Sequence, residues 1–574
     1  MKTKVNKLTR CAWYMIPLYF VLVLGFASCD MDYYPSDEQS TDVIMQEASG
    51  MIMDGCYSLL KEEVEYLGYP SGNTYCRHWF QMAEFPADNI CLSGRSTDPL
   101  FQATTYTMTD NLQNVGTLWM LGYKIIYMTN TLIETLDETE EENKQNLGEA
   151  YFMRALMHLN LVTMFAKPYH LSERDNIGIP LRTATLSTET KRNSVGEVYD
   201  QIEKDLLKAS ELMDDKSRGN AGYPSKDAAL GLLSRVYLYM ERYQDCYKLV
   251  EKMLGGNDKQ AALAKLDPDL ASYFINAKTS SETLFCIAHE VTEDRGQSSI
   301  GSMYNKDGGG WGEIYPSFTL LNLYERYPDD VRYKAFILPQ YKNGKASDTL
   351  SVYVPVGTAG SVEKRDVMSA VVTYDALTDT YSFFDDGAWT VQKRPAAQAE
   401  YSEYYVANYN GEDTLPVRIM PYNLETRNTY PKFYMTKFGY QNGSPTLSSP
   451  VVLRWAEVIL NAAEAYAHEG DDTHALEFVN AIRTRAQIPD SGMFSTSQMH
   501  GYQNALEVVM DERRLELAFE GHRMIDVYRN KQNMDRRYPG VQQWKVVPYT
   551  DNHIQYPIPN AELSVSGIEQ NLGY

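Results

Sequence analysis

Apolar and polar positions alternate with a helical period along most of the chain between positions 41 and 260. Apolar side chains recur there at spacings of three and four, which is the pattern of amphipathic helices. It predicts helices near residues 41–62, 114–137, 145–166, 195–213 and 225–254. Ser194 and Glu197 form a capping box at the start of one helix, and Ser225 is an N-cap for another. The period returns near 450–488 and 503–530, so we expect a mainly α fold.

Two of these regions resemble the tetratricopeptide pattern, in which small residues let two antiparallel helices pack closely. One pair lies within 225–254. The other lies within 450–488, where Tyr466 precedes Gly470 and Ala475 at the expected offsets. The matches are degenerate. Alone, they predict tetratricopeptide-type helical hairpins and no particular function.

The middle of the chain lacks the helical period. Glycines punctuate the run from Asp307 to Trp311, and residues 351–356 and 370–374 form short β-like runs. We therefore predict an irregular, loop-rich subdomain with short β-hairpins. The chain is then divided into an N-terminal apolar segment, a short tether, an N-terminal helical part, the irregular part, and C-terminal helices with a tail. Their expected bounds are 1–28, 29–40, 41–260, 261–448 and 449–574.

The N-terminal segment has the layout of a secretory signal peptide. Positive charges precede an uncharged apolar run over 11–28, which ends in the small residues Ala27 and Ser28 before Cys29. A run of this length could instead span a bilayer as a permanent anchor. Small residues followed at once by cysteine favour cleavage and acylation of the Cys29 thiol, as by palmitate in a lipoprotein. Phe26 stands where leucine is usual in such sites.

Charge and composition narrow the class of ligand. The 574 residues carry a formal net charge of −23, with a pI near 4.9. Such a surface repels the phosphates of nucleic acid and anionic lipid, so we expect no nucleic-acid partner. Tyrosine is abundant, at 44 residues against 18 phenylalanines. It suits wet, polar interfaces, although many of these rings can simply pack on helices. A neutral ligand fits this composition.

Motifs for catalysis and cofactor binding are scarce. The chain contains no HExxH, GxSxG, P-loop or GxGxxG sequence. Five cysteines lie beyond Cys11 and Cys29, an odd number without CxxC spacing, so we expect no zinc site or disulfide framework. We expect no cofactor and no enzymatic activity. With 76 acidic residues, a carboxylate pair could still serve a glycoside hydrolase, which remains an alternative.

The C-terminal third carries a specific family resemblance. The segment Asp511–Arg529, DERRLELAFEGHRMIDVYR, resembles the ER-x-x-E-L-x-F-E-G-x-R-x-x-D-x-x-R signature of the SusD/RagB family. Leu453–Glu464 resembles the preceding family helix, and Pro557–Tyr574 the usual terminus, with Leu572 in place of proline and without an asparagine in Ser564–Gly567. Weaker matches lie at Trp119–Asn130, Glu149–Ala155, Pro316–Leu320 and Asp329–Arg332.

The resemblance implies a SusD-like fold and a lipoprotein at the surface of the outer membrane. The acidic residues after Cys29 are similar to the surface-export signal of Bacteroidota lipoproteins. Such a protein captures oligosaccharide or polysaccharide and acts as the lid of a SusC-like TonB-dependent transporter. A scaffold-only, tetratricopeptide-type protein-interaction module is a further alternative, and it predicts no glycan affinity.

A stripe of charge runs along the family signature. Glu512, Arg513, Glu516, Glu520 and Arg523 recur at spacings of three and four, so they share one helical face, while Arg514 points elsewhere. Two of these carboxylates could form a catalytic pair. Arginines on the same face argue against a raised pKa, which favours an ion-pair network that locks helices together.

In the family that this chain resembles, binding sites tend to lie on loops after the first helices and in the irregular middle. The resemblance therefore implies that 261–448 is a ligand-binding part, and it directs the search for glycan-binding residues to these loops. Trp311 lies in a glycine run that denies it helical neighbours, and Tyr304 lies seven residues before it. Trp389 stands beside Asp385, Asp386 and Gly387, and Arg95 lies in a Ser/Gly/Thr loop. Rings on such loops can stack on sugars while polar groups hydrogen-bond to hydroxyls. By contrast, we expect Trp79, Trp119 and Trp455 to lie on helices, the last two in the core.

Overall fold

The computed structural model describes residues 41–68, 72, 74–92, 98–172, 174–186, 190–357, 366–394 and 402–574. The chain divides into two compact units, Met1–Ala48 and Ser49–Tyr574. The predicted signal peptide, lipidation site Cys29 and glycan-contacting Arg95 lie outside the described residues. Within the described ranges, no helix has both the length and the apolar character needed to cross a membrane.

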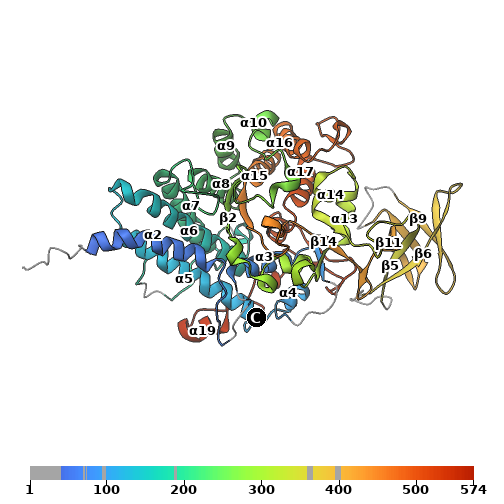
Figure 1. Cartoon of the computed structure of the whole chain (residues 1–574), viewed down its shortest axis with the longest axis horizontal. Coiled ribbons are helices and arrows are strands. Elements are labelled where there is room, and N and C mark those ends of the chain that lie inside the picture. Colours follow the sequence, from blue (N-terminus) through green and yellow to red (C-terminus); the bar gives the residue numbers. More distant parts are fainter. Residues whose placement is uncertain are drawn as a thin grey trace, which may run out of the picture. The chain divides into compact units, whose positions relative to one another are not determined.

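Helices form the N-terminal half of the second unit, as the apolar spacing predicted. Helix α2 (Thr41–Leu59) begins in the first unit, and its residues from Ser49 onward belong to the second. The next helices are α3 (Tyr75–Glu84), α4 (Phe101–Thr105), α5 (Gln113–Thr135), α6 (Glu141–Phe165), α7 (Val195–Leu212), α8 (Lys226–Tyr239) and α9 (Tyr243–Leu254). From α5 to α9, each helix packs against the next (Figure 1). The capping box of Ser194 and Glu197 is confirmed.

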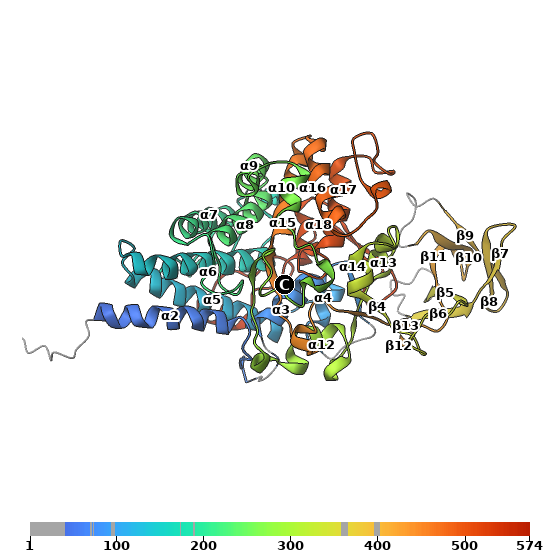
Figure 2. The ribbon, with the colours of Figure 1, turned by 45° about the horizontal axis from the view of Figure 1, so that its top comes forward.

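The predicted helical hairpins are confirmed. Helix α8 packs against α9, and α15 (Trp455–His468) packs against α16 (Asp472–Arg485) (Figure 2). The two hairpins also meet, because α15 contacts both α8 and α9. Small residues make this approach possible: Ala462 and Ala463 are fully buried.

Helices return within 503–530 as predicted, but the single helical face predicted from Glu512 to Arg523 is wrong, because a turn interrupts it. The chain forms α17 (Ala505–Glu516) and α18 (Arg523–Arg529), separated by a turn. Phe519 and Gly521 have φ angles of 71° and 82° there, a left-handed conformation that ends a helix. Arg523 therefore leaves the predicted charged stripe and pairs instead with Asp88, at 2.7 Å.

The stripe's carboxylates Glu512, Glu516 and Glu520 enter a buried ion-pair network, whereas Arg513 pairs separately with Glu464 and Asp526, at 3.2 and 3.1 Å. Five carboxylates and five cations are joined in it, and all of these side chains are at most 3% exposed. They are Glu282, Asp330, Glu512, Glu516 and Glu520 with Arg332, Lys437, Arg454, Arg483 and Arg485. The five negative charges balance the five positive charges, so the network can lie in the core. It joins α16 and α17 to the middle of the chain.

Short helices lie in the middle of the chain, and two-stranded antiparallel sheets lie between positions 90 and 547. The helices include α10 (Lys259–Leu263), α11 (Leu270–Tyr273), α12 (Gly301–Tyr304), α13 (Phe318–Glu325) and α14 (Val331–Phe336). The paired strands are β1 (Ile90–Leu92) with β3 (Ile314–Pro316), β2 (Thr283–Cys286) with β15 (Val451–Arg454), β4 (Ile337–Pro339) with β14 (Phe433–Met435), β12 (Thr426–Arg427) with β13 (Tyr430–Pro431), and β16 (Met534–Asp535) with β17 (Val546–Val547). Near the C-terminus lies α19 (Asn560–Ser566).

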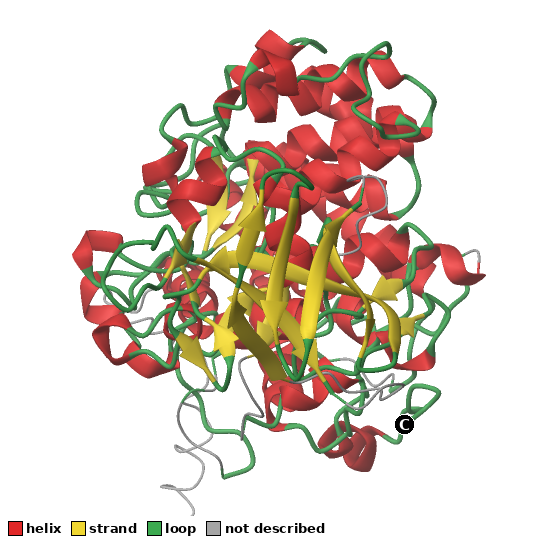
Figure 3. Cartoon of the chain, turned by 90° about the vertical axis from the view of Figure 1, so that its right-hand side faces the viewer, coloured by secondary structure: helices red, strands yellow, loops and turns green. Residues whose placement is uncertain are grey.

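Residues 350–421 form a larger sheet than the short hairpins that the sequence predicted. Its strands are β5 (Leu350–Val356), β6 (Asp366–Val371), β7 (Thr373–Asp375), β8 (Thr380–Phe384), β9 (Ala388–Lys393), β10 (Tyr404–Tyr409) and β11 (Glu412–Pro421). They pair in the order β6-β5-β11-β10-β9-β8-β7, with each registered pair antiparallel. Figure 3 shows these strands in front of the helices.

This sheet closes into a small barrel. Its two edge strands, β6 and β7, are separated only by Val372, whose amide donates to Leu350 O at 3.0 Å. One bent strand therefore pairs with β5 through its first half and with β8 through its second. The interior holds a hydrophobic cluster of its own, made of Val352, Val354, Val372, Phe383, Val391, Val406, Tyr409, Leu415 and Val417.

Candidate functional site

The Trp311 loop leads into the small antiparallel sheet that β3 forms with β1. Strands β1 and β3 pair so that Leu92 lies opposite Ile314. Arg95 lies outside the described residues.

The Trp311 ring is held at the surface of the molecule. The side chain is 45% exposed, and its Nε1 donates to Gln297 O at 3.1 Å. The amides of Trp311 and Gly312 both donate to Ser302 O, at 2.7 and 3.0 Å. Backbone and ring are thus fixed, which lowers the entropy lost when a ligand binds.

The glycines around Trp311 are required by the path of the loop. Gly308, Gly309 and Gly312 have φ angles of 63°, 85° and 51°, a region that favours glycine. At Gly310 a Cβ atom would lie 2.2 Å from Asn305 O. The glycine run, which predicted a loop, is therefore a closely packed turn, and Trp311 projects from it.

Arg427 fastens this loop from a distant part of the chain. Its Nη1 donates to Trp311 O at 2.6 Å and to Gly312 O at 3.2 Å, and its Nη2 pairs with Glu313 Oε1 at 2.9 Å. It lies at the end of β12, before a tight turn with positive φ angles at Asn428 and Thr429. No local signal pointed to Arg427, because it is 116 positions away from Trp311 in the chain.

Tyr440 adds a second aromatic ring beside the loop. Its hydroxyl donates to Asp307 Oδ2 at 2.6 Å, and the side chain is half-buried. Burial, together with the Asp307 carboxylate, raises the pKa of this hydroxyl, which therefore stays protonated as a donor. The sequence analysis missed Tyr440. A signal existed, because Gly439 and Gly443 punctuate its segment as glycines punctuate that of Trp311.

Tyr304, a predicted glycan contact, lies in the core. It is 1% exposed, and its ring lies against Phe438 and Phe519, with centroid distances of 5.4 and 5.9 Å. A sugar must reach at least one face of a stacking ring, so this conformation excludes stacking by Tyr304. Tyr304 is the last residue of helix α12, whose Ser302 carbonyl accepts the hydrogen bonds of the Trp311 loop.

Trp389, another predicted contact, belongs to the barrel. Its Nε1 donates to Asp385 O at 2.9 Å, and its ring meets Tyr409 edge-on at 4.9 Å. The side chain is half-buried and packs on the barrel interior. The structure thus does not join Trp389 to the contacts around Trp311, and its geometry is that of a packing residue. Trp119 and Trp455 are buried on helices, as predicted.

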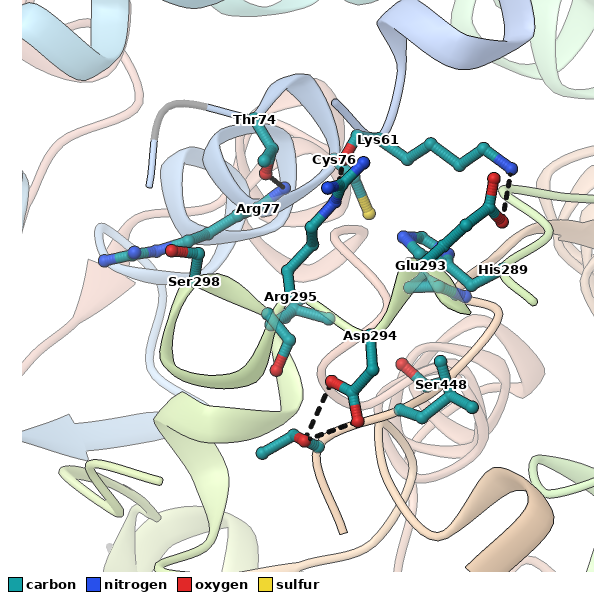
Figure 4. Close-up of a pocket in the computed structure, with 15 residues that line it drawn as sticks. Lys61, Thr74, Cys76, Arg77, His289, Glu293, Asp294, Arg295, Ser298 and Ser448 are labelled. Atoms are coloured by element: carbon teal, nitrogen blue, oxygen red, sulfur yellow. Dashed lines mark hydrogen bonds and ion pairs between the residues drawn. The ribbon is translucent and has the colours of Figure 1, made fainter. Parts of the chain in front are cut away.

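A small cavity lies between α3 and the segment 289–299 (Figure 4). The same segment contains Gln297, which accepts the hydrogen bond of Trp311. Lys61 pairs with Glu293 there at 2.7 Å. Burial works against the charge of Glu293, yet hydrogen bonds from Lys61 and the Glu290 amide outweigh it and hold its pKa below the ordinary value. The cavity has a volume of about 20 Å³, room for roughly one water molecule, so it cannot hold a sugar.

One carboxyl that acts on buried Tyr304 has an unusual pKa. Glu84, whose pKa burial raises to about 7, has the protonation range of a general acid. It is fully buried, however, and accepts a hydrogen bond from the Gly521 amide, so no glycosidic oxygen can reach it. Among the described residues, no group of three or more His, Cys, Asp and Glu side chains is placed to hold a metal ion.

Comparison with known proteins places these features in a family. Residues 280–574, more than half of the chain, match the SusD family, and residues 85–238 match a family described as starch-binding associating with outer membrane. The chain is 24% identical to SusD-like protein P2 of Formosa agariphila, over 80% of this chain and 81% of that protein. It is 23% identical to SusD-like protein P38 of the same organism, over 86% and 87%.

Solved structures share the fold. A SusD superfamily protein from Bacteroides thetaiotaomicron aligns with a TM-score of 0.66 at 22% identity, over 92% of this chain and 99% of that one. A structure described as a laminarin-binding SusD-like protein aligns with a TM-score of 0.57 at 21% identity, over the same shares. The predicted mainly α, SusD-like fold is confirmed. The chain belongs to the SusD family.

Proposed function

We propose that this protein is a glycan-binding protein that captures oligosaccharide or polysaccharide with the surface around Trp311. The observation that carries the proposal is a large ring, 45% exposed, on a loop that hydrogen bonds fix in place. An aromatic ring kept in water on a rigid loop serves recognition more often than packing. Membership of the SusD family and the laminarin-binding description of one structural relative support the same ligand class.

Trp311 supplies the stacking face in this proposal. Sugars present apolar C–H faces that pack on aromatic rings, and their hydroxyls need polar partners around the ring. Asp307 offers carboxylate oxygens beside the Tyr440 hydroxyl. Arg427 is a positioning residue, because its guanidinium is committed to Trp311 O, Gly312 O and Glu313.

The charges favour a neutral glycan. A net charge of −23 repels sulfated or uronate-rich chains over the Debye length, whereas neutral sugars meet no such electrostatic penalty. Glu84, whose pKa burial raises, is fully buried and out of reach of a sugar. A glycoside hydrolase would need a carboxyl with a raised pKa within reach of the sugar.

We further propose that the protein is anchored in the outer membrane through acylated Cys29 and forms the lid of a SusC-like TonB-dependent transporter. The lipoprotein layout of the segment that ends at Cys29 supports the anchor. The match over residues 85–238 to a family associating with the outer membrane supports the location. A scaffold without glycan affinity is the competing function.

Affinity electrophoresis tests the proposal. The chain starting at Asp30 is run through native gels that contain laminarin, starch or another neutral polysaccharide, and we expect retardation by at least one. New reducing ends in the same mixtures would indicate a hydrolase. Co-purification of a TonB-dependent transporter with the tagged, lipidated protein, without retardation by any polysaccharide, would favour the scaffold.

A further inference from the structure

A second pocket lies on the helical part of the molecule, between α5, the segment 180–185 and α19. Its volume is about 290 Å³. This is close to the lower end of small-molecule pockets, which begin at roughly 300 Å³. None of the residues that line it belongs to the Trp311 loop, to β12 or to the segment around Tyr440.

The segment 180–185, which lines the pocket opposite α5, is hydrogen-bonded to that helix. Four hydrogen bonds among the described residues join them: from Tyr123 Oη to Pro180 O (2.8 Å), from Asn130 Nδ2 to Arg182 O (3.2 Å), from the Thr185 amide to Glu134 Oε1 (2.9 Å), and from the Thr185 hydroxyl to Glu134 Oε2. Their partners on α5 are spaced along the helix over three turns, so the segment 180–185 is held along its length. The pocket is thus formed before any ligand arrives, which favours affinity.

Trp119 and Glu562 both line the pocket and are joined by a hydrogen bond. Trp119 Nε1 donates to Glu562 Oε2 at 3.1 Å, and this bond fastens α19 beside α5. The Trp119 ring packs on Tyr123 and Phe165, with centroid distances of 4.9 and 4.8 Å. Among the described residues no hydrogen bond reaches Glu562 Oε1, so this atom can accept one from a ligand hydroxyl.

Tyr127 gives the pocket an exposed ring. It follows Tyr123 by one helical turn and is 56% exposed. An exposed ring beside a carboxylate provides one apolar face and one set of acceptors. Arg182 and Glu562 bring opposite charges to the lining, so a neutral ligand with hydroxyl groups fits better than an ion.

We infer that this pocket is a second carbohydrate subsite, which takes one neutral sugar ring. Tyr127 stacks on the C–H face of the ring, and Glu562 Oε1 accepts hydrogen bonds from its hydroxyls. The inference rests on the proposed glycan-binding function and adds a site that shares no residue with the Trp311 surface. A chain end or a short oligosaccharide can then bind at either site independently.

Calorimetric titration with oligosaccharides of laminarin and of starch tests the second subsite. The chain starting at Asp30 is compared with its Tyr127→Ala, Glu562→Gln and Trp311→Ala variants. Glutamine at 562 retains an oxygen that accepts the Trp119 bond, so the pocket stays intact. Tyr422→Ala is the matched control, because Tyr422 is also exposed (47%) and does not line the pocket.

We expect two sites in the wild-type chain for at least one oligosaccharide series. Tyr127→Ala should weaken one of them about 5- to 150-fold, by analogy with the loss of one stacking platform. Glu562→Gln should weaken the same site about tenfold, and neither change should affect the other site. Trp311→Ala should show the reverse pattern, and Tyr422→Ala should bind like wild type.

Two results would overturn the second subsite. One is unchanged binding by both Tyr127→Ala and Glu562→Gln, and the other is a single wild-type site that Trp311→Ala removes completely. Either result leaves the proposed glycan-binding function standing. Absence of binding by the wild-type chain to either series and to the polysaccharides of the gel assay would contradict that function as well.

Discussion

Replacing Glu516 with glutamine should destabilise the protein without affecting glycan binding. Glu516 lies at the centre of the buried network, where Oε1 contacts Arg454 at 2.6 Å and also Arg485, and Oε2 contacts Arg332 at 3.0 Å. Glutamine has nearly the same shape but no charge. The change therefore leaves five cations facing four carboxylates in the core.

The size of the effect follows from burial. Breaking a buried ion pair on one side costs about 3–5 kcal/mol, because the partner charge stays in a medium of low dielectric constant. Unfolding entropy is about 2.1 cal/mol/K per residue near 60 °C, so in a cooperative unit as long as Ser49–Tyr574 this cost lowers Tm by roughly 3–5 °C. Exposed ion pairs contribute only about 0–1 kcal/mol.

Thermal melting of the purified variant measures the effect. Lys334→Ala is the control, because its ion pair with Asp329 is exposed, and its Tm should stay close to that of the wild type. A Glu516→Gln protein that melts like this control would refute the structural role of the network. One that melts normally but loses glycan affinity would move Glu516 into the binding site.

The effect of Glu516→Gln on stability should also depend on pH. Burial alone would raise the pKa of Glu516, but Arg485, Arg454 and Arg332 outweigh it and hold the pKa below the ordinary 4.5. A lowered folded-state pKa adds stability that is present above pH 4.5 and is lost as the pH falls toward the folded value. The difference in Tm between wild type and Glu516→Gln should therefore be full at pH 7 and shrink below about pH 4.

Three further substitutions test the Trp311 loop, the barrel and the lipid anchor separately. Gly310→Ala should displace the Trp311 loop, because its Cβ would meet Asn305 O at 2.2 Å; calorimetry should show about tenfold weaker glycan binding, and unchanged affinity would contradict the fixed loop. Trp389→Ala should lower stability by about 1–3 kcal/mol, measured by melting, through lost packing on Tyr409, while affinity stays the same; a loss of affinity instead would restore Trp389 as a glycan contact. Cys29→Ala should abolish labelling by a radioactive fatty acid, and labelling that persists would exclude acylation at this position.

Local features of the sequence predicted the helical parts well. The capping box at Ser194 and the hairpin at Tyr466 depend on residues a few positions apart, so their spacing is visible in the chain. The ion-pair role of Glu512 and Glu516 followed from their helical spacing for the same reason. The common helical face predicted from Glu512 to Arg523 is wrong because the turn after α17 depends on Phe519 adopting a positive φ angle, which its side chain does not predict.

Long-range pairing was the main feature that local patterns could not reveal. The barrel closes because the amide of Val372 meets Leu350, and no local pattern encodes that contact. In the candidate site, glycine spacing identified the Trp311 loop but could not place Arg427 against it. Tyr304 lies seven positions before Trp311 in the chain, which suggested a glycan contact, but the fold buries its side chain. The predicted boundaries 41–260 and 261–448 remain predictions.

The most direct test of glycan capture is the affinity of Trp311→Ala for a polysaccharide that the wild-type protein binds. Calorimetric titration gives the affinity, and thermal melting of the same sample gives the stability. Because Trp311 is 45% exposed, we expect Tm to stay close to wild type while affinity falls about 5- to 150-fold, the effect of about 1–3 kcal/mol of lost stacking. Unchanged affinity with a large fall in Tm would contradict the proposed site and make Trp311 a packing residue.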